Sequence, residues 1–362
     1  ARVIAFYLPQ YHPIPENDKY WGKGFTEWTN VAKAKPLFRG HYQPHIPADL
    51  GFYDLRLPEV REAQAELARD AGIEGFCYYH YWFGNGKMLL QKPFEEVLRL
   101  GKPDFPFCLC WANHDWTTKT WVKGSSMVNN TMIAQQEYLG EQDDIKHFEY
   151  CLRAFKDHRY ITIEGKPIFL IYDPLSFPNV KEFMNRWNFL AKKNNLKGIY
   201  FIGVTTGRQS SYKIVTNLGF DGVCHNRRWE AEAKAAGFRF VRRMQSLLGW
   251  HLGISLMKYD YNKVVRNYDT PENKLENCYP VITPGFDRTP RAGRRAGIYV
   301  NSSPKNFKKH VAEICKSIQD KDDDHRLVFL SAWNEWGEGN YMEPDLKWGH
   351  GYLEALKSVV KF

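Results

Sequence analysis

Two glutamates, Glu335 and Glu338, stand three residues apart in the stretch LVFLSAWNEWGEGNYMEPD, shortly after a run of four apolar residues. Carboxylates placed beside aromatic faces lose hydration and tend toward raised pKa values, so stability alone rarely places them there. A pair of carboxylates can instead act on the two sides of a glycosidic bond, one as an acid and one as a base. The alternative interpretation is an exposed turn whose acids face water.

Glycines beside the pair bear on whether both acids can reach one substrate. On a regular strand, residues three apart point to opposite faces, which would separate the two carboxylates. Gly337 and Gly339 allow the chain to curl, so we expect both acids to face one cleft. We also expect Trp333 and Trp336 to raise the pKa of the more buried carboxyl and so keep it protonated as an acid.

Eight short apolar runs, rich in β-branched and aromatic residues, predict the strands that position this pair. Their interiors are almost continuously apolar, as in parallel strands that are covered on both faces. Amphipathic stretches with a helical period separate many of them, for example LPEVREAQAELARDAG and SPKNFKKHVAEICKSIQD. The expected strands are Val3–Pro9, Gly75–Trp82, Pro106–Asn113, Pro167–Asp173, Ile199–Thr205, Phe220–Asn226, Tyr279–Gly285 and Leu327–Trp333.

Eight strands alternating with helices predict an α/β fold, a (β/α)₈ TIM barrel, as a single domain over residues 1–362. A doubly wound sheet is the alternative, but no glycine-rich phosphate loop follows any expected strand. The structure of the segment Trp229–Asn277 stays open, with extra helices as one interpretation.

The connection after the first strand is long and forms part of the expected cleft. Its sequence, GKGFTEWTNVAKAKPLFRGHYQPHIPADLGFYD, has too many Gly, Pro and aromatic residues for us to expect a helix. Long loops in compact folds are usually lids or binding walls. Glu27, Trp28, Tyr42 and His45 are therefore candidates to line the cleft, with aromatic packing that merely caps the barrel as the alternative.

Polar and aromatic residues gather where the expected strands end, which is where TIM barrels carry their active sites. Solvated loops would supply polar residues, but not a Trp, or a Tyr beside His or Asp, at most of these ends. Trp and Tyr offer an apolar face and a polar group, which suits sugar binding. The predicted substrate-binding residues are Tyr7, His12, Glu27, Trp28, His45, Tyr79, His80, Trp82, Trp111, Asn113, His114, Asp115, Tyr172, Asp287, Arg291, Trp333, Asn334 and Trp336.

Charge and apolar patterning argue against several other classes. The formal charge of +9 invites a nucleic-acid interpretation, but Lys and Arg are scattered among Asp and Glu, so we expect no nucleic-acid partner. An anionic substrate or membrane surface fits this charge better. No apolar run approaches the roughly 18 residues of a spanning helix, so no transmembrane segment is expected. The oligomeric state stays open.

The metal and redox signals are weak. Twelve histidines are dispersed without an H-E-x-x-H motif or paired C-x-x-C motifs, so we expect no metal and no cofactor. The D-x-D spacing in KDDDHR, residues Lys321 to Arg326, precedes the last expected strand and reads as a solvated turn far from the site. Seven cysteines, mostly in apolar runs, favour a reducing, cytoplasmic compartment. Because the chain starts at Ala1, a trimmed leader and a periplasmic location are the alternative.

Several long blocks in one order make the chain resemble the WbsX-type glycosyltransferase family, which is similar to glycoside hydrolase family 99. The resemblance covers nearly the whole length. The blocks are IAFYLPQYHPIPENDKYWGKGFTEWTNV, GHYQPHIPADLGFYDLR, GFCYYHYWF, PDFPFCLCWAN and WNEWGEGNYMEPD.

The resemblance implies a (β/α)₈ barrel and, from family 99, a retaining endo-acting α-mannoside hydrolase. The family motif N-E-W-x-E-G matches residues 334–339. By this resemblance Glu335 draws the proton from the sugar 2-hydroxyl, whose oxygen then forms a 1,2-anhydro sugar. Glu338 protonates the leaving group and later activates the incoming hydroxyl.

Two departures from the family pattern bear on substrate identity. Relatives usually read W-A-N-E-N-W after the third strand, whereas this chain has His114 and Asp115 in the middle of that motif. A histidine in place of the acid could favour an anionic sugar. Phe286 stands where a tryptophan is more usual.

The expected function is therefore a glycoside hydrolase that cleaves an α-linked, mannoside-like bond in a polysaccharide or glycan with retention. One alternative is a glycosyltransferase or transglycosidase in surface polysaccharide (O-antigen, lipopolysaccharide) biosynthesis. The missing nucleotide loop and the distant D-x-D spacing disfavour sugar-nucleotide use. A second alternative is a non-catalytic carbohydrate-binding barrel, which would not need two acids with opposite protonation requirements.

Overall fold

Eight parallel strands close into a barrel in the computed structural model, which describes residues 1–118, 131–207, 209–236 and 257–360. Each strand pairs with its neighbours in parallel register, and β1 closes the barrel by pairing with both β14 and β2. The predicted TIM barrel is confirmed, and each expected apolar run overlaps one of its strands. The strands are β1 (Arg2–Tyr7), β2 (Gly75–Trp82), β4 (Phe107–Trp111), β8 (Lys166–Ile171), β9 (Tyr200–Val204), β10 (Gly222–His225), β12 (Cys278–Ile282) and β14 (Leu327–Leu330).

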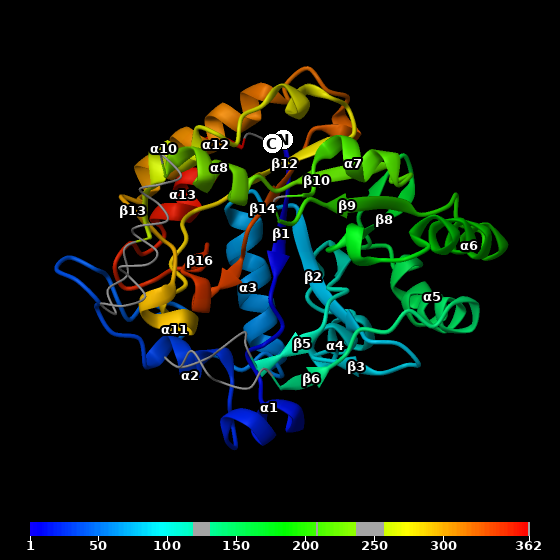
Figure 1. Ribbon diagram of the computed structural model, residues 1–362, viewed down its shortest axis with the longest axis horizontal. Coiled ribbons are helices and arrows are strands. Elements are labelled where there is room, and N and C mark those ends of the chain that lie inside the picture. The colour runs from blue at the N-terminus through cyan, green and yellow to red at the C-terminus, as the bar shows by residue number, and fades with distance from the viewer. Residues whose placement is uncertain (119–130, 208, 237–256, 361–362) are drawn as a thin grey trace.

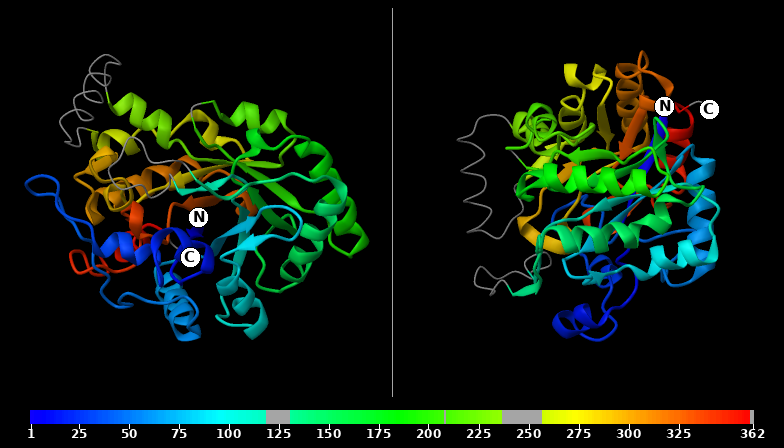
Figure 2. Two further views of the ribbon diagram at one scale, coloured as in Figure 1. Left: turned by 60° about the horizontal axis from the view of Figure 1, so that its bottom comes forward. Right: turned by 90° about the vertical axis from the view of Figure 1, so that its right-hand side faces the viewer.

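Helices surround the barrel on its outside (Figures 1 and 2). The amphipathic stretches identified in the sequence fold as expected, and two further helices, α8 and α10, occupy the described part of the segment that the sequence left open. The helices are α3 (Pro58–Asp70), α4 (Lys92–Leu100), α5 (Glu141–Phe155), α6 (Val180–Lys193), α7 (Tyr212–Asn217), α8 (Arg228–Ala235), α10 (Tyr261–Val265), α12 (Pro304–Ser317) and α13 (Gly351–Lys357).

The connection after β1 is only partly the helix-free loop that we expected. A short helix, α2 (Glu27–Ala32), lies within it, so that prediction is wrong for these residues. The cause is a capping box: the Thr26 side chain accepts from the backbone of Thr29, whose own side chain accepts from the Thr26 backbone N–H. A second helix, α1 (Pro15–Trp21), precedes this stretch, with Pro15 at its first position.

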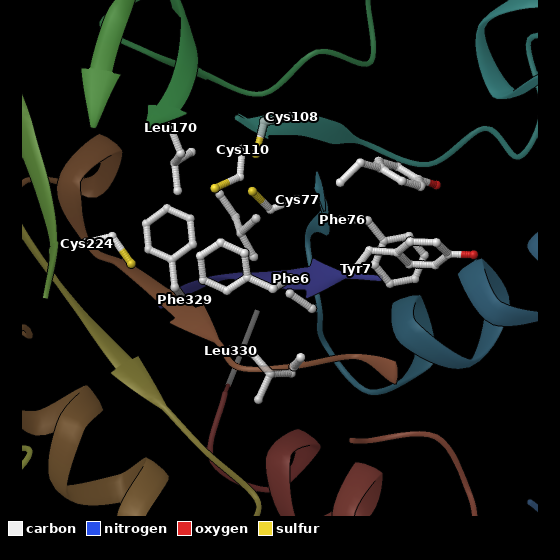
Figure 3. Packing of buried hydrophobic residues seen from close by; sticks show 14 of the residues in the cluster. Phe6, Tyr7, Phe76, Cys77, Cys108, Cys110, Leu170, Cys224, Phe329 and Leu330 are labelled. Carbon is white, nitrogen blue, oxygen red and sulfur yellow. The ribbon is translucent and has the colours of Figure 1, made fainter. Parts of the chain in front are cut away.

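The barrel core combines aromatic rings with small thiols. Figure 3 shows Phe6, Phe329 and Cys110 gathered together, whereas Tyr7 lies at the tip of β1 beside Phe76. Phe6 and Phe329 stack with ring centroids 5.5 Å apart. The seven cysteines are all free, and six are buried, so they act as small apolar side chains.

The parallel strands place all their carboxyl ends at one end of the barrel. β1 points toward α1, α2 and α11 (Thr289–Ala292), which lie together at the bottom of Figure 1. The exposed acidic turn at 322–324 directly precedes β14 and therefore lies at the opposite end, as predicted. No helix within the described residues is long and apolar enough to cross a membrane.

Candidate active site

A cavity of about 350 Å³ opens at the carboxyl ends of the barrel strands. Glu335 and Glu338 both line it, so the structure brings the two glutamates to one cleft. Four of the predicted substrate-binding residues line the same cavity: Tyr79, His114, Tyr172 and Arg291. Each comes from a different strand end, which is how barrels of this type assemble a site.

The chain curls after β14 as the glycines predict. β15 (Asn334–Glu335) pairs antiparallel with β16 (Asn340–Tyr341), and a 3₁₀ turn, Trp336–Glu338, joins them. Gly339 ends this turn at φ +56°, a left-handed conformation that favours glycine. Gly337 is needed for another reason, since a Cβ atom there would lie 1.9 Å from the carboxylate oxygen of Glu27.

One guanidinium contacts three carboxylates at the cavity wall. Arg291, on α11, places its Nε atom 2.9 Å from Glu27 Oε1 and its Nη2 atom 2.9 Å from Glu335 Oε2. Its Nη1 atom lies 2.8 Å from Glu338 Oε1. Glu27 is fully buried, so it positions the arginine and does not line the cavity. Arg291 thereby fixes both candidate catalytic glutamates relative to one another.

The two glutamates differ in how readily they hold a proton. Burial raises the pKa of Glu335 to about 7, against the opposing effect of Arg291. Burial would also raise the pKa of Glu338, but Arg291, Arg228 and Arg288 outweigh it and the pKa is lowered. The cavity thus keeps Glu338 ionised and lets Glu335 exchange a proton near neutral pH.

The tryptophans of the motif interact with a third carboxyl that the sequence did not single out. Trp336 Nε1 donates a hydrogen bond of 2.5 Å to Glu343 Oε2, which also accepts from Tyr53 OH at 2.8 Å. Gln64 Nε2 donates to the other oxygen at 2.6 Å. Burial raises the pKa of Glu343 to about 7. We predicted that Trp333 and Trp336 would raise the pKa of one carboxyl of the pair. In the structure, burial and the positive charges of the arginines have the largest effects on the pKa values of Glu335 and Glu338.

Several predicted substrate-binding residues lie behind the cavity wall and not on it. Trp333 and Trp336 are completely buried, and Asn334 exchanges two hydrogen bonds with the backbone of Leu8. Tyr7 donates to Gln64 on α3. The remaining members of this group are Trp28, whose indole donates to the backbone of Tyr53, and the buried His12. These side chains hold the strand end that carries the glutamates.

A second set points outward from the barrel because side chains alternate along a strand. On β2, Tyr79 and Tyr81 face the cavity, whereas His80 and Trp82 face α5. His80 Nε2 lies 2.8 Å from His147 Nε2, and Trp82 donates to Asp143. Trp111 packs on the same outer side and donates to the backbone of Trp82.

The last predicted residues shape neighbouring loops. Asn113 donates to Tyr138 and to the Asp173 backbone, and Asp115 accepts from the Gln136 backbone. His45 and Asp287, together with Tyr42, line a second cavity of about 330 Å³. The two cavities share Phe286 and Tyr299 as lining residues.

Most of the cavity wall was not predicted from the sequence, since the predicted site residues supply six of its 26 lining residues. Arg228 and Trp229 closely follow the expected strand Phe220–Asn226, but they were not singled out. Tyr81 was not predicted because both faces of a fully buried strand are apolar, so the sequence does not show which residues point inward. Further lining residues that were not singled out are Gln10, Trp116, Asn226, Tyr268, Arg288 and Tyr299.

One buried group among the described residues has ligand atoms close enough to hold a metal ion. It comprises His80, His147 and Cys151, whose ligand atoms lie within 4.8 Å of one another. The group lies on the outer side of β2, away from the cavity, and the hydrogen bond between the two imidazoles already occupies one nitrogen of each. This group therefore takes no part in the chemistry of the cavity.

Comparison with known proteins identifies relatives over the full length of the chain. The family described as "Glycosyltransferase WbsX" matches residues 3–356. Two proteins named WxcX, from two strains of Xanthomonas campestris pv. campestris, are 34% identical over 361 residues, which is 99% of this chain. The chain spans about half the length of these curated relatives.

Two solved structures share the fold. A GH99 endo-alpha-mannosidase from Bacteroides thetaiotaomicron superposes with a TM-score of 0.59 at 15% identity, covering 99% of this chain and 96% of that one. A structure described as a glycoside hydrolase-like protein gives a TM-score of 0.59 at 16% identity, covering 100% and 94%. At these identities the likeness concerns the barrel and its connections.

Proposed function

The chain belongs to the WbsX glycosyltransferase family of carbohydrate-active enzymes, and we propose that it cleaves an α-linked, mannoside-like glycosidic bond in a polysaccharide or glycan with retention. The observation that carries this proposal is the glutamate pair on Arg291. Two carboxyls face one cavity at the barrel mouth, are fixed by one cation, and differ in pKa. Glycosidic cleavage requires an acid and a base at one anomeric centre, and the difference in pKa means that Glu338 must gain a proton before it can act as the acid.

The proposed first step forms a 1,2-anhydro sugar. The sugar 2-hydroxyl gives its proton to Glu335 while its oxygen bonds to the anomeric carbon. The bond from that carbon to the leaving oxygen breaks, and the leaving oxygen takes a proton from Glu338. A sugar hydroxyl is a weak acid, so a base with a pKa of about 7 serves this step better than an ordinary carboxylate.

The second step opens the three-membered ring. Water gives a proton to Glu338 while its oxygen bonds to the anomeric carbon. The anhydro bond breaks, and the 2-oxygen recovers its proton from Glu335. Two successive inversions at the anomeric carbon give net retention, and no carboxylate bonds to the sugar.

Glu338 must gain a proton before the first step, although its pKa is lowered in the cavity without substrate. The loosest of its contacts are those with Arg288, at 3.3 Å, and with Arg228, at 3.9 Å. A substrate that draws these two cations away from the carboxylate would raise its pKa. The same substrate would bring the leaving oxygen to Glu338.

A second candidate, glycosyl transfer, is favoured by the same arginines. A leaving phosphate needs no proton, and guanidinium groups beside it would stabilise its charge. The family description as a glycosyltransferase agrees with this candidate.

The test is the release of new reducing ends from a panel of α-mannosides and bacterial surface polysaccharides. We expect release by the wild-type protein and its loss in Glu338→Gln. Glu182→Gln, an exposed position on α6, is the matched control and should act as wild type. Labelled sugar transferred from a nucleotide donor, without release on any substrate, would establish the second candidate in place of the first.

A further inference from the structure

Arg228 is a cavity residue with a fixed orientation. It is the first residue of α8, which begins three residues after β10 ends, and it lines the same cavity as the two glutamates. Its guanidinium lies over two aromatic rings, 4.5 Å from the centroid of Phe286 and 4.8 Å from that of Trp229. Stacking on aromatic faces holds the planar guanidinium in place before any ligand arrives.

The contacts of this guanidinium with acids are long. Its Nη1 atom lies 3.9 Å from Glu338 Oε2, and its Nε atom lies 3.9 Å from Glu232 Oε1. Both distances exceed that of a hydrogen bond. Among the described residues, the structure gives the Arg228 side chain no hydrogen-bond acceptor, so its donors remain for a ligand in the cavity.

Glu338 already has two cationic partners, so neutralising its charge does not require Arg228 as a third. Arg291 already contacts it at 2.8 Å, and Arg288 lies 3.3 Å away. Arg228 and Arg288 both line the cavity, with side chains 28% and 38% exposed, whereas Arg291 is only 7% exposed. Positive charge therefore faces the space that a substrate would fill, on the Glu338 side.

We propose that Arg228, which packs on Trp229 and Phe286, binds an anionic group of the sugar substrate: a carboxylate of an acidic sugar or a phosphate of an activated one. Both groups match the forked donors of a guanidinium. The inference rests on the proposed function, because it takes the substrate to bind in this cavity. It narrows the proposed substrate class to sugars that carry an anionic group.

The bound anion would also prepare Glu338 for its role. The charged groups that face this carboxylate are Arg228, Arg288, Arg291 and Glu335. An anion that pairs with Arg228 offsets part of the positive charge that now keeps Glu338 ionised. The pKa of Glu338 then rises, and the carboxyl can carry the proton that the leaving oxygen needs.

A binding measurement tests the inference without requiring turnover. Calorimetric titration of the wild-type protein would compare inorganic pyrophosphate, an oligouronate and a neutral mannan oligosaccharide of similar length. We expect Arg228→Met to weaken binding of at least one of the two anions by about tenfold or more and to leave the neutral sugar unchanged. Arg153→Met, at an exposed position on α5, is the matched control and should bind as wild type.

Each outcome decides the question. Loss confined to the oligouronate identifies an acidic sugar, and loss confined to pyrophosphate identifies an activated sugar. Equal binding of both anions by Arg228→Met and wild type overturns the inference, as does a wild-type protein that binds neither anion. Arg228→Lys repeats the test should the methionine variant unfold, because it keeps the charge and removes the fork. If the anions bind through Arg228 but no sugar is ever cleaved or transferred, the proposed function fails while the anion site stands.

Discussion

Arg291→Met should destabilise the protein far more at alkaline than at acidic pH. The substitution leaves Glu27, Glu335 and Glu338 facing one another without the cation that contacts each of them within 2.9 Å. Breaking a buried ion pair by removing one partner costs about 3–5 kcal/mol, because an uncompensated charge stays buried. The folded variant can avoid this cost by protonating a carboxyl, and the free energy that protonation requires depends on pH.

The size of the pH effect follows from the titration of a carboxyl. Protonating a group whose unperturbed pKa is about 4.3 requires roughly 5 kcal/mol at pH 8 and roughly 1 kcal/mol at pH 5. Loss of the cation raises the pKa of Glu335 and Glu338 in the folded variant. The stabilisation that comes from this raised pKa is fully present at pH values below the pKa of the unfolded chain, and it is lost as the pH rises. We expect a loss of about 1 kcal/mol at pH 5 and about 3–5 kcal/mol at pH 8.

Urea denaturation at the two pH values measures this difference directly. Arg153→Met, on the surface of α5, controls for the loss of one arginine and should change stability by less than about 0.5 kcal/mol at either pH. Equal destabilisation of Arg291→Met at pH 5 and pH 8 would refute the idea that this guanidinium compensates the buried carboxylates.

Two further perturbations examine how the glutamates are positioned. Burial raises the pKa of Glu343 from 4.5 to about 7, so its contribution to stability is present below pH 4.5 and is lost as pH rises through 7. As the pH rises from 5 to 8, the free energy of unfolding of Glu343→Gln should therefore increase by up to about 3 kcal/mol relative to that of wild type. Parallel pH curves of unfolding free energy for the two proteins would contradict this. Gly337→Ala places a Cβ atom 1.9 Å from a Glu27 oxygen and should cost about 1–3 kcal/mol with loss of activity, whereas Gly297→Ala, whose nearest neighbour lies at 3.6 Å, should be tolerated.

The barrel could be predicted from the sequence because its strands are buried on both faces. Runs such as the one that became β14 (Leu327–Leu330) are continuously apolar, and this pattern separates parallel strands from alternating ones. The same continuity hides which residues point inward. His80 and Trp82 were therefore expected in the cavity, although the structure turns them toward α5 and places Tyr81 inside.

The glutamate pair could also be found from the sequence, but its supporting charges could not. Glu335 and Glu338 carry a motif with glycines that permit a turn. Arg291 was expected to touch substrate, yet it is tied to three carboxylates from two distant segments of the chain, Glu27 and the pair Glu335 and Glu338. The hydrogen bonds of Glu343 depend on partners from two other segments, and no spacing in the sequence announces such an arrangement.

The most direct test of the central claim follows the anomeric proton by NMR while the wild-type protein cleaves an α-linked substrate from the panel. A 1,2-anhydro intermediate predicts that the α-configured product forms first and then equilibrates with the β form. Glu335→Gln and Glu338→Gln should each abolish the signal, while Glu182→Gln should leave it unchanged. Initial formation of the β product, or cleavage at the wild-type rate by either active-site variant, would contradict the assignment of this chemistry to the pair.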